Sequence, residues 1–267
     1  MTELISNTGE RTIPEKWRET KEGYLLLLRL QFAYEYALTK IPDNSYVLEV
    51  GCGDGYGTRM LSEKTKKIIG IDVDKQAIEE AKNKYGTDKC VFQVYDGQEL
   101  PYSNDTFDAI ASFQVIEHVN DDKGFVSEIN RVLKKGGIFM VTTPNKTYRL
   151  KKGQKPFNPF HVREYYPEEL EELLRTAFKN VEMCGIRGTE VVQKIEVSRV
   201  QNPGLNRIIN LRKIVPEPLK PFAIKLIKII KKTNPKRDFL EKFKTSDYYV
   251  IKDNLSESLD LLGICRK

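Results

Sequence analysis

Between residues 46 and 143, short apolar runs alternate with amphipathic helical segments, and this alternation restricts the fold more than any other feature of the sequence. The runs are too short for buried helices and carry the β-branched and aromatic residues of covered strands. Strands that alternate with helices form a parallel sheet with helices on both faces. We therefore predict an α/β fold with a doubly wound, mostly parallel sheet. The expected strands are Tyr46–Val50, Ile68–Asp72, Val91–Tyr95, Phe107–Phe113 and Ile138–Thr143, and the expected helices are Tyr56–Lys66, Lys75–Tyr85 and Asp121–Leu133.

The flanking segments complete this architecture. Apolar residues at helical spacing within residues 15–40 predict one or two N-terminal helices. Pro167 is followed by glutamates that complement a helix dipole, which predicts a helix to Phe178. Two more strands are expected at Val181–Ile186 and Leu259–Cys265. The chain then divides into an N-terminal helical cover (1–45), a core (46–187), a helical insertion (188–258) and a last core strand with the C-terminus (259–267).

Composition narrows the class of protein. The 267 residues are 40% hydrophobic and 31% charged, which fits a globular protein and excludes disordered, collagen-like and polytopic membrane proteins. The four cysteines lie far apart without a Cys-x-x-Cys pair, so neither a disulfide framework nor a thiolate zinc site is expected. The N-terminus lacks the apolar segment of a secretion signal, and no run is long enough to span a bilayer. We expect a cytoplasmic protein.

A glycine-rich turn follows the first predicted strand. Glycines let the backbone turn sharply and approach a ligand where a Cβ would collide, and such a turn entering a helix fits a nucleotide-like ligand. The spacing is not that of a dinucleotide site, because Tyr56 or Thr58 stands where its third glycine belongs. No Gly-Lys-Ser/Thr of a Walker-type phosphate loop follows. The glycines alternate with other residues, at Gly51, Gly53, Gly55 and Gly57.

Three acidic residues stand at the ends of the first three strands. Asp72 closes the second strand, where a carboxylate can accept both hydroxyls of a ribose. Asp96 closes the third strand, where it can accept from an adenine amino group. Glu49 precedes the glycines and adds negative charge, so the ligand must be cationic or neutral rather than a polyphosphate. Together the three acids indicate a nucleoside-containing ligand.

These residues resemble the motifs of the class I S-adenosylmethionine-dependent methyltransferases, in the branch that O-methylates small molecules and glycans. The resemblance covers roughly residues 46–178 and implies an enzyme with a Rossmann-like sheet of seven strands, the last of them reversed. It also implies S-adenosyl-L-methionine as the cofactor. The matching motifs are Glu49-x-Gly51-x-Gly53-x-Gly55, Gly70-Ile71-Asp72, Asp96-Gly97-Gln98-Glu99-Leu100-Pro101 with Phe107-Asp108, and Leu133-Lys134-Lys135-Gly136-Gly137.

The same resemblance implies roles for residues of the cofactor site. Gly51 and Gly53 would lie against the methionine portion, and Asp72 would hold the ribose. Asp96 would hold the adenine amino group, helped by the backbone of Gln98. The full set of expected cofactor-binding residues is Glu49, Gly51, Gly53, Gly55, Asp72, Val73, Asp96, Gly97, Gln98 and Gln114.

The chain has only two histidines, His118 and His161. Each follows a strand at the sheet edge where the methyl group would be presented, so both can reach one pocket. A hydroxyl acceptor benefits from a base, whereas an amine acceptor needs only to be neutral. We predict that His161 is the general base toward a hydroxyl and that Glu117 and His118 orient it or the acceptor. The alternative is structural, with the Glu117–His118 pair bonded to backbone groups.

The sequence leaves a metal site open. Glu117, His118 and His161 resemble the Glu-x-x-Glu-His pattern with a distant histidine that binds metal in small-RNA 2′-O-methyltransferases and some ubiquinone-pathway O-methyltransferases. Gln114 stands where the first glutamate of that pattern would be, which removes one charged ligand. The sequence therefore contains only part of the pattern that would bind a divalent metal here.

The net charge of +6 is concentrated in one segment. Residues 201–237 hold ten basic residues and one acid, Glu217, a net +9 that leaves −3 for the rest of the chain. Basic amphipathic helices are expected there, at Leu205–Val215 and Pro218–Lys232. They fit a lid over the acceptor pocket or, in a second interpretation, contact with an anionic membrane surface or an acidic acceptor. Nucleic acid is not favoured, because Phe222 is the only aromatic residue in the segment.

The sequence thus predicts O-methylation of a small molecule, a glycan or a lipid-linked intermediate. In the second interpretation of the basic segment, the enzyme sits peripherally at the inner membrane face. Two alternatives stay open: N-methylation, for which His161 would be dispensable, and a non-catalytic cofactor-binding scaffold. The acceptor itself is not predicted, because its selectivity lies in the cover and the insertion, where the resemblance is weakest.

Overall fold

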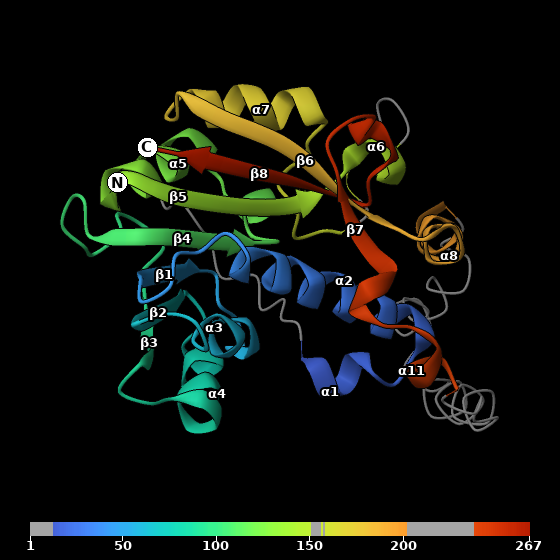
Figure 1. The fold of residues 1–267 in the computed structure, drawn as a ribbon, viewed down its shortest axis with the longest axis horizontal. Coiled ribbons are helices and arrows are strands. Elements are labelled where there is room, and N and C mark those ends of the chain that lie inside the picture. Colours follow the sequence, from blue (N-terminus) through green and yellow to red (C-terminus); the bar gives the residue numbers. More distant parts are fainter. Residues whose placement is uncertain (1–12, 151–155, 157, 202–237) are drawn as a thin grey trace, which may run out of the picture.

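The computed structural model describes residues 13–150, 156, 158–201 and 238–267, which form an eight-stranded sheet with helices on both faces (Figure 1). The strands are β1 (Tyr46–Val50), β2 (Lys67–Asp72), β3 (Cys90–Val94), β4 (Phe107–Phe113), β5 (Leu133–Pro144), β6 (Asn180–Gly188), β7 (Tyr248–Ile251) and β8 (Asp260–Arg266). Their order in the sheet is β3-β2-β1-β4-β5-β8-β6-β7. β1 to β6 run parallel to one another, and β7 and β8 run the opposite way.

The predicted α/β class, with a mostly parallel sheet and a reversed last strand, is confirmed, but the predicted number of seven strands is wrong. β7 lies within residues 188–258, which the sequence assigns to a helical insertion. It pairs antiparallel with β6, from Gly185 opposite Ile251 to Gly188 opposite Tyr248. Tyr248 is the one fully buried residue of this four-residue strand, so no apolar run marks it in the sequence. The insertion therefore ends in the sheet.

Helices cover the two faces of the sheet unequally. The helices are α1 (Pro14–Trp17), α2 (Lys21–Leu38), α3 (Tyr56–Leu61), α4 (Lys75–Tyr85), α5 (Asp122–Val132), α6 (Lys146–Arg149), α7 (Pro167–Arg175), α8 (Glu190–Gln201) and α11 (Phe239–Lys242), with short 3₁₀ helices η1 (Ile116–His118), η3 (Thr245–Asp247) and η4 (Leu255–Glu257). Side chains of α2, α3, α4, α8 and α11 share one apolar core. Those of α5 and α7 form the core on the other face.

Local hydrogen bonds explain where several helices begin and end. Asp74 caps α4 by accepting from N–H groups of its first turn, and Asp121 does the same for α5. The predicted bounds of α4 are therefore confirmed at both ends. α3 is shorter than the predicted Tyr56–Lys66, and the hydroxyl of its C-cap residue Ser62 donates to the carbonyl of Arg59 in the last turn.

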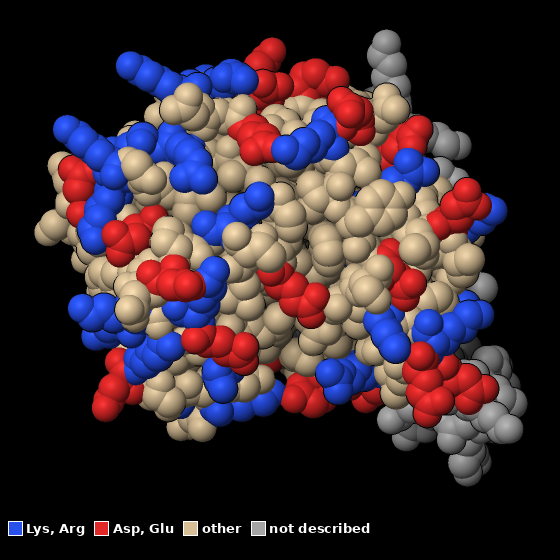
Figure 2. All heavy atoms as spheres, viewed as in Figure 1, with Lys and Arg blue, Asp and Glu red and all other residues tan. Residues whose placement is uncertain are grey.

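The carboxyl ends of β1 to β5 meet at one edge of the sheet, and α2 and α8 lie beside that edge (Figure 1). The basic helices predicted at Leu205–Val215 and Pro218–Lys232 lie outside the described residues. On the face seen in Figure 2, acidic and basic side chains are interspersed. Of the helices that the structure describes, none is long and apolar enough to cross a membrane.

Candidate functional site

The glycine-rich turn between β1 and α3 uses its glycines in two ways. At Gly53, φ is +52°, a left-handed conformation that favours glycine, and an added Cβ would meet no atom of the described residues within 4 Å. An added Cβ at Gly51 would lie 2.3 Å from Val115, and one at Gly55 would lie 2.6 Å from Phe92. Gly51 and Gly55 therefore let the turn pack against the protein, whereas Gly53 faces open space in which a cofactor can approach the backbone.

The acid at the end of β2 contacts this turn. Asp72 Oδ2 accepts from the N–H of Gly53 at 2.8 Å, and its Oδ1 accepts from the N–H of Asp74 at 2.9 Å. Burial raises the pKa of Asp72 above its ordinary value. Val73 is half-buried and packs against the core on the α5 and α7 face. The structure therefore brings together Gly53, Asp72 and Val73, which the sequence assigns to one site.

Glu49 is buried beneath the turn, with 1% of its surface exposed. Its Oε1 accepts from the Tyr34 hydroxyl of α2 at 2.6 Å, and its Oε2 accepts from the Thr58 hydroxyl of α3. Burial raises the pKa of Glu49 to about 7. Gly57 makes room for this arrangement, because a Cβ there would lie 2.0 Å from the ring of Tyr34. Glu49 thus ties two helices to the end of β1, a role that its strand-end position does not reveal.

Asp96 and Gln98 form a compact turn after β3. The exposed Asp96 accepts from the N–H of Gln98 through Oδ1 at 2.9 Å. The Tyr95 hydroxyl donates to the carbonyl of Gln98, also at 2.9 Å. Gly97 has φ of +80° and lets the backbone reverse between them. The backbone of Gln98 is thus bonded within its own loop at both polar groups.

Gln114 follows β4 and has φ of +58°, a conformation that residues with side chains rarely adopt. The backbone N–H of Gln114 donates to the carbonyl of Thr142 at 2.9 Å, and its side-chain amide donates to the hydroxyl of Thr142 at 3.3 Å. The next residue, Val115, packs against Gly51 of the glycine-rich turn. Strained backbone of this kind is concentrated at functional sites, which agrees with the predicted place of Gln114 in the site.

The two histidines meet, as their positions after β4 and β5 predict. Their rings are 4.9 Å apart between centroids and nearly perpendicular, at 84°. His118 Nδ1 lies 3.0 Å from the carbonyl of Phe160, and because a carbonyl only accepts, this nitrogen carries the hydrogen. The loop that bears His161 is held by a hydrogen bond from the N–H of Val162 to the carbonyl of Glu117, at 2.8 Å.

Glu117 completes a cluster with the two histidines. One possible ligand atom from each of Glu117, His118 and His161 lies within 4.8 Å of the other two. Glu117 is buried, and its Oε2 accepts from the Thr143 hydroxyl at 3.0 Å. Burial raises the pKa of its carboxyl to about 8. The cluster combines one carboxyl group and two imidazoles, a donor set that suits a divalent transition metal once the carboxyl has lost its proton.

Glu164 also belongs to this site, although no sequence motif indicates it. Its Oε1 accepts from Nδ1 of His161 at 3.0 Å and from Nε of Arg149 at 3.0 Å. Burial favours the neutral carboxyl, but the hydrogen bond with His161 and the charge of Arg149 outweigh it and lower the pKa of Glu164. Its Oε2 is buried without a hydrogen-bond partner among the described residues. The spacing His161-x-x-Glu164 is the signal that could have identified it.

A second buried ionic cluster lies at the start of β8. Arg29 of α2 is 3% exposed and lies 2.8 Å from Asp260 and 3.3 Å from Glu196 of α8. Asp260 is opposite Pro144 of β5 in the sheet, so the cluster adjoins the strand that precedes the His161 loop. The cluster therefore ties the N-terminal cover and the insertion to the strand that precedes the His161 loop.

Comparison with known protein families identifies the central part of the chain. Residues 48–141 match a family model described as a methyltransferase domain. This range runs from β1 into β5 and includes the glycine-rich turn, the acids after β2 and β3, and Glu117 with His118. His161 and Glu164 lie outside it.

Individual relatives extend the match. A protein of Mycolicibacterium smegmatis, described as a probable S-adenosylmethionine-dependent methyltransferase, is 38% identical over 175 residues, which are 66% of this chain and 65% of that protein. The chain therefore spans just under two thirds of that relative's length. A ubiquinone biosynthesis O-methyltransferase of Pelagibacter ubique is 34% identical over 108 residues, 40% of this chain and 45% of that protein.

Solved structures agree on the fold. An S-adenosylmethionine-dependent methyltransferase of Thermotoga maritima, described as a possible histamine N-methyltransferase, superposes with a TM-score of 0.57 over 90% of this chain and 91% of that one. The two are 18% identical, so this likeness concerns the fold alone.

Proposed function

We propose that this chain, which belongs to the class I S-adenosylmethionine-dependent methyltransferases, transfers the methyl group of S-adenosylmethionine to a hydroxyl oxygen. The acceptor is a small molecule, a glycan or a lipid-linked intermediate, and the basic character of residues 201–237 supports an anionic or lipid-linked form. The observation that carries the proposal is the hydrogen bond between Nδ1 of His161 and the buried carboxylate of Glu164. A hydroxyl benefits from such a base, whereas a neutral amine does not require one.

The pair His161 and Glu164 supplies the proton transfer. Glu164 holds the imidazole with Nδ1 protonated, so that Nε2 carries the lone pair. His161 accepts the hydroxyl proton at Nε2, and the ionised Glu164 stabilises the imidazolium that results. S-adenosylmethionine, when bound, supplies a methyl group whose carbon–sulfur bond breaks as the carbon–oxygen bond forms.

The cluster of Glu117, His118 and His161 also fits a divalent cation. Both histidines direct Nδ1 at an oxygen acceptor, as metal-binding histidines do, which makes Nε2 the ligand atom. Three protein ligands leave a coordination position for an acceptor oxygen. A cation held there would lower the pKa of the acceptor hydroxyl. In that case His161 serves as a ligand and not as the base.

The test of the function is release of S-adenosylhomocysteine by the purified chain with panels of hydroxylated and amine-bearing acceptors. We expect turnover of a hydroxylated acceptor, and a loss of about 10²–10⁴-fold in His161→Ala with cofactor affinity unchanged within about twofold. Arg175→Ala, on the exposed side of α7, is the control. Wild-type turnover by His161→Ala would favour N-methylation, and cofactor binding without turnover of any acceptor would favour a scaffold.

Metal removal separates the two roles of His161. Turnover is measured after treatment with EDTA and again after addition of Mg²⁺, Mn²⁺ or Zn²⁺. Loss of turnover that one cation restores supports a metal held by Glu117, His118 and His161. Full turnover in EDTA supports the base alone.

A further inference from the structure

We propose that Glu128 and Arg131 of α5 are positioning residues for the cofactor, because they fix the loop between β3 and β4 that carries Asp96, Gly97 and Gln98. The proposal rests on the proposed function, because the resemblance to S-adenosylmethionine-dependent methyltransferases is what assigns this loop to the adenine. Both side chains belong to α5 and lie apart from the Glu117–His161 cluster, so we expect them to affect cofactor affinity and not the transfer step.

Glu128 and Arg131 form a two-pronged ion pair one helical turn apart. Arg131 Nε lies 2.7 Å from Glu128 Oε1, and Arg131 Nη2 lies 2.8 Å from Glu128 Oε2. Two parallel hydrogen bonds fix the orientation of both groups. The side chain of Arg131 is 31% exposed and that of Glu128 is 17% exposed, so water screens the pair only in part. The hydrogen bonds from Arg131 lower the pKa of Glu128, which is therefore ionised at neutral pH.

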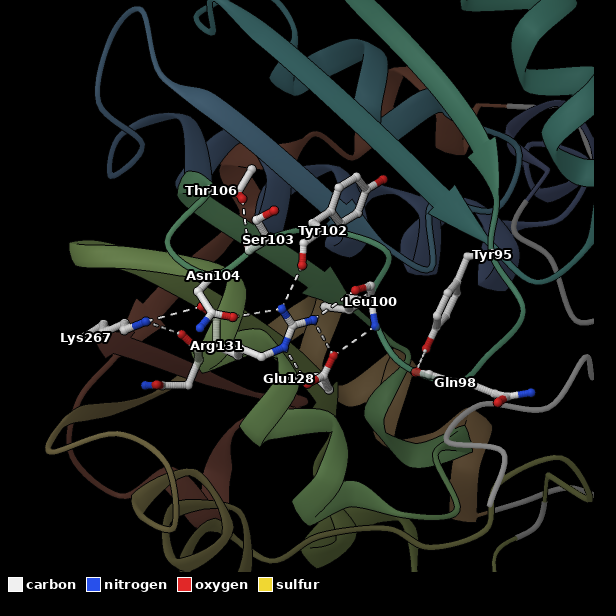
Figure 3. A network of polar contacts seen from close by, with 11 residues as sticks. Tyr95, Gln98, Leu100, Tyr102, Ser103, Asn104, Thr106, Glu128, Arg131 and Lys267 are labelled. Atoms are coloured by element: carbon white, nitrogen blue, oxygen red, sulfur yellow. Dashed lines mark hydrogen bonds and ion pairs between the residues drawn. The ribbon is translucent and has the colours of Figure 1, made fainter. Parts of the chain in front are cut away.

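This pair binds both backbone polar groups of Leu100. The N–H of Leu100 donates to Glu128 Oε2 at 2.9 Å, and its carbonyl accepts from Arg131 Nη2 at 2.9 Å. Figure 3 shows the guanidinium of Arg131 between Glu128 and the loop, with hydrogen bonds to the carboxylate of Glu128 and to the carbonyl of Leu100. A shift of the loop by one residue would break both hydrogen bonds, so the pair fixes its register.

Arg131 also holds the loop at two points beyond Leu100. Its Nη1 donates to the carbonyl of Tyr102 at 2.7 Å and to the side-chain oxygen of Asn104 at 3.1 Å. The hydroxyl of Tyr102 in turn donates to Gln93 of β3 at 2.9 Å. The loop is therefore held from α5 and from β3 at once. A lysine could not reproduce this, because its donors radiate from a single atom.

The held segment leads directly to the residues assigned to the adenine. Gln98 precedes Leu100 by two positions, and its own hydrogen bonds with Asp96 and Tyr95 continue the chain of contacts. A loop that is ordered before binding loses less conformational entropy when a ligand arrives. Without the ion pair, part of the binding free energy would be spent on ordering the loop.

The test is calorimetric titration of the full chain with S-adenosylmethionine and, separately, with adenosine. We expect Arg131→Ala to raise both dissociation constants about tenfold, since both ligands carry the adenine. Arg131→Lys keeps the charge without the fork, and we expect an intermediate effect. Arg175→Ala removes an exposed i,i+4 ion pair with Glu171 on α7 and should change neither constant by more than about twofold.

Hydrogen exchange supplies a local measurement that a general loss of stability would not reproduce. The amide of Leu100 should exchange faster in Arg131→Ala, while the amides of β4 keep their protection. If that variant does not fold, Glu128→Gln carries the same expectation, and Arg131→Lys carries the same direction with a smaller effect. A folded variant with a faster Leu100 amide and unchanged adenosine affinity would overturn the proposal. Binding is measured without an acceptor, so failure of hydroxyl methylation would overturn the proposed function alone.

Discussion

Two parts of the sheet edge differ in how far apart their residues lie in the sequence. One is the glycine-rich turn with Glu49, Asp72 and Asp96, proposed to hold the cofactor and called the cofactor side. The other is the cluster of Glu117, His118 and His161 with the adjoining Arg29 ion pairs, proposed to face the acceptor and called the acceptor side. The cofactor side is mostly local: apart from Tyr34 and Val115, the contacts described around the glycine-rich turn join residues within 49–98. The acceptor side is assembled from distant segments, as the contacts of Arg29 with Glu196 and Asp260 illustrate. A local site can be recognised from motifs, whereas a site built from distant segments depends on how the whole chain folds.

Among the substitutions that test this difference, Arg29→Ala should change the free energy of unfolding most. It leaves Asp260 buried without its paired cation and Glu196 with Arg199 alone, so we expect a loss of about 3–5 kcal/mol in the free energy of unfolding. Cofactor affinity of the folded protein should stay within about twofold. Urea unfolding and cofactor titration measure the two quantities.

Lys194→Ala is the matched control for Arg29, because Lys194 pairs with Glu190 on the exposed face of α8. We expect a change below about 1 kcal/mol. If Arg29→Ala lowered the free energy of cofactor binding as much as the free energy of unfolding, the cofactor side and the acceptor side would not be energetically independent.

Glu49→Gln should change the pH dependence of stability. The pKa of Glu49 is about 7 in the folded chain and 4.5 as its ordinary value, so the unfolded chain loses this proton first. The contribution of Glu49 to stability is therefore full below pH 4.5 and is lost as the pH rises toward 7, by at most about 3 kcal/mol. In the variant, the fall in unfolding free energy between pH 4.5 and 7 should be smaller by that amount. An identical pH profile would mean that the pKa of Glu49 is the same in the folded and the unfolded chain.

Tyr34→Phe should give the smallest effect. It removes the hydroxyl that donates to Glu49 but keeps the ring that packs against Gly57, so we expect a loss of about 1–2 kcal/mol. Because the contact supports the glycine-rich turn, cofactor affinity should fall as well, by a few-fold. Thermal unfolding and cofactor titration provide the check, with Tyr36→Phe as a control on the same helix. Cofactor affinity equal to that of the control would place Tyr34 outside the cofactor side.

On the cofactor side, the sequence predicts where the residues lie in the fold better than it predicts which side chains they contact. The contact between Gly53 and Asp72 follows from strand order, because both lie at the carboxyl ends of neighbouring parallel strands. The burial of Glu49 does not follow, because its partner Tyr34 lies on another helix. Helical spacing shows that α2 has an apolar face but not which residue of the sheet that face meets.

On the acceptor side, the sequence predicts that the histidines meet but not what holds them. His118 and His161 each follow a strand at the same edge, which is sufficient to bring them together. Glu164 was missed because the conformation of an irregular loop decides whether a carboxylate three residues away reaches the imidazole. Arg29 was missed because its position in a helical pattern does not distinguish a buried arginine from a solvated one.

The position of β8 sets an order in time as well as in space. It lies between β5 and β6, although residues 189–259 separate it from β6 in the chain. During synthesis, the facing edges of β5 and β6 therefore stay unpaired until Asp260–Arg266 has left the ribosome, and unpaired edges are prone to aggregation. Because Asp260 also closes the cluster with Arg29, the nascent chain completes its acceptor side last.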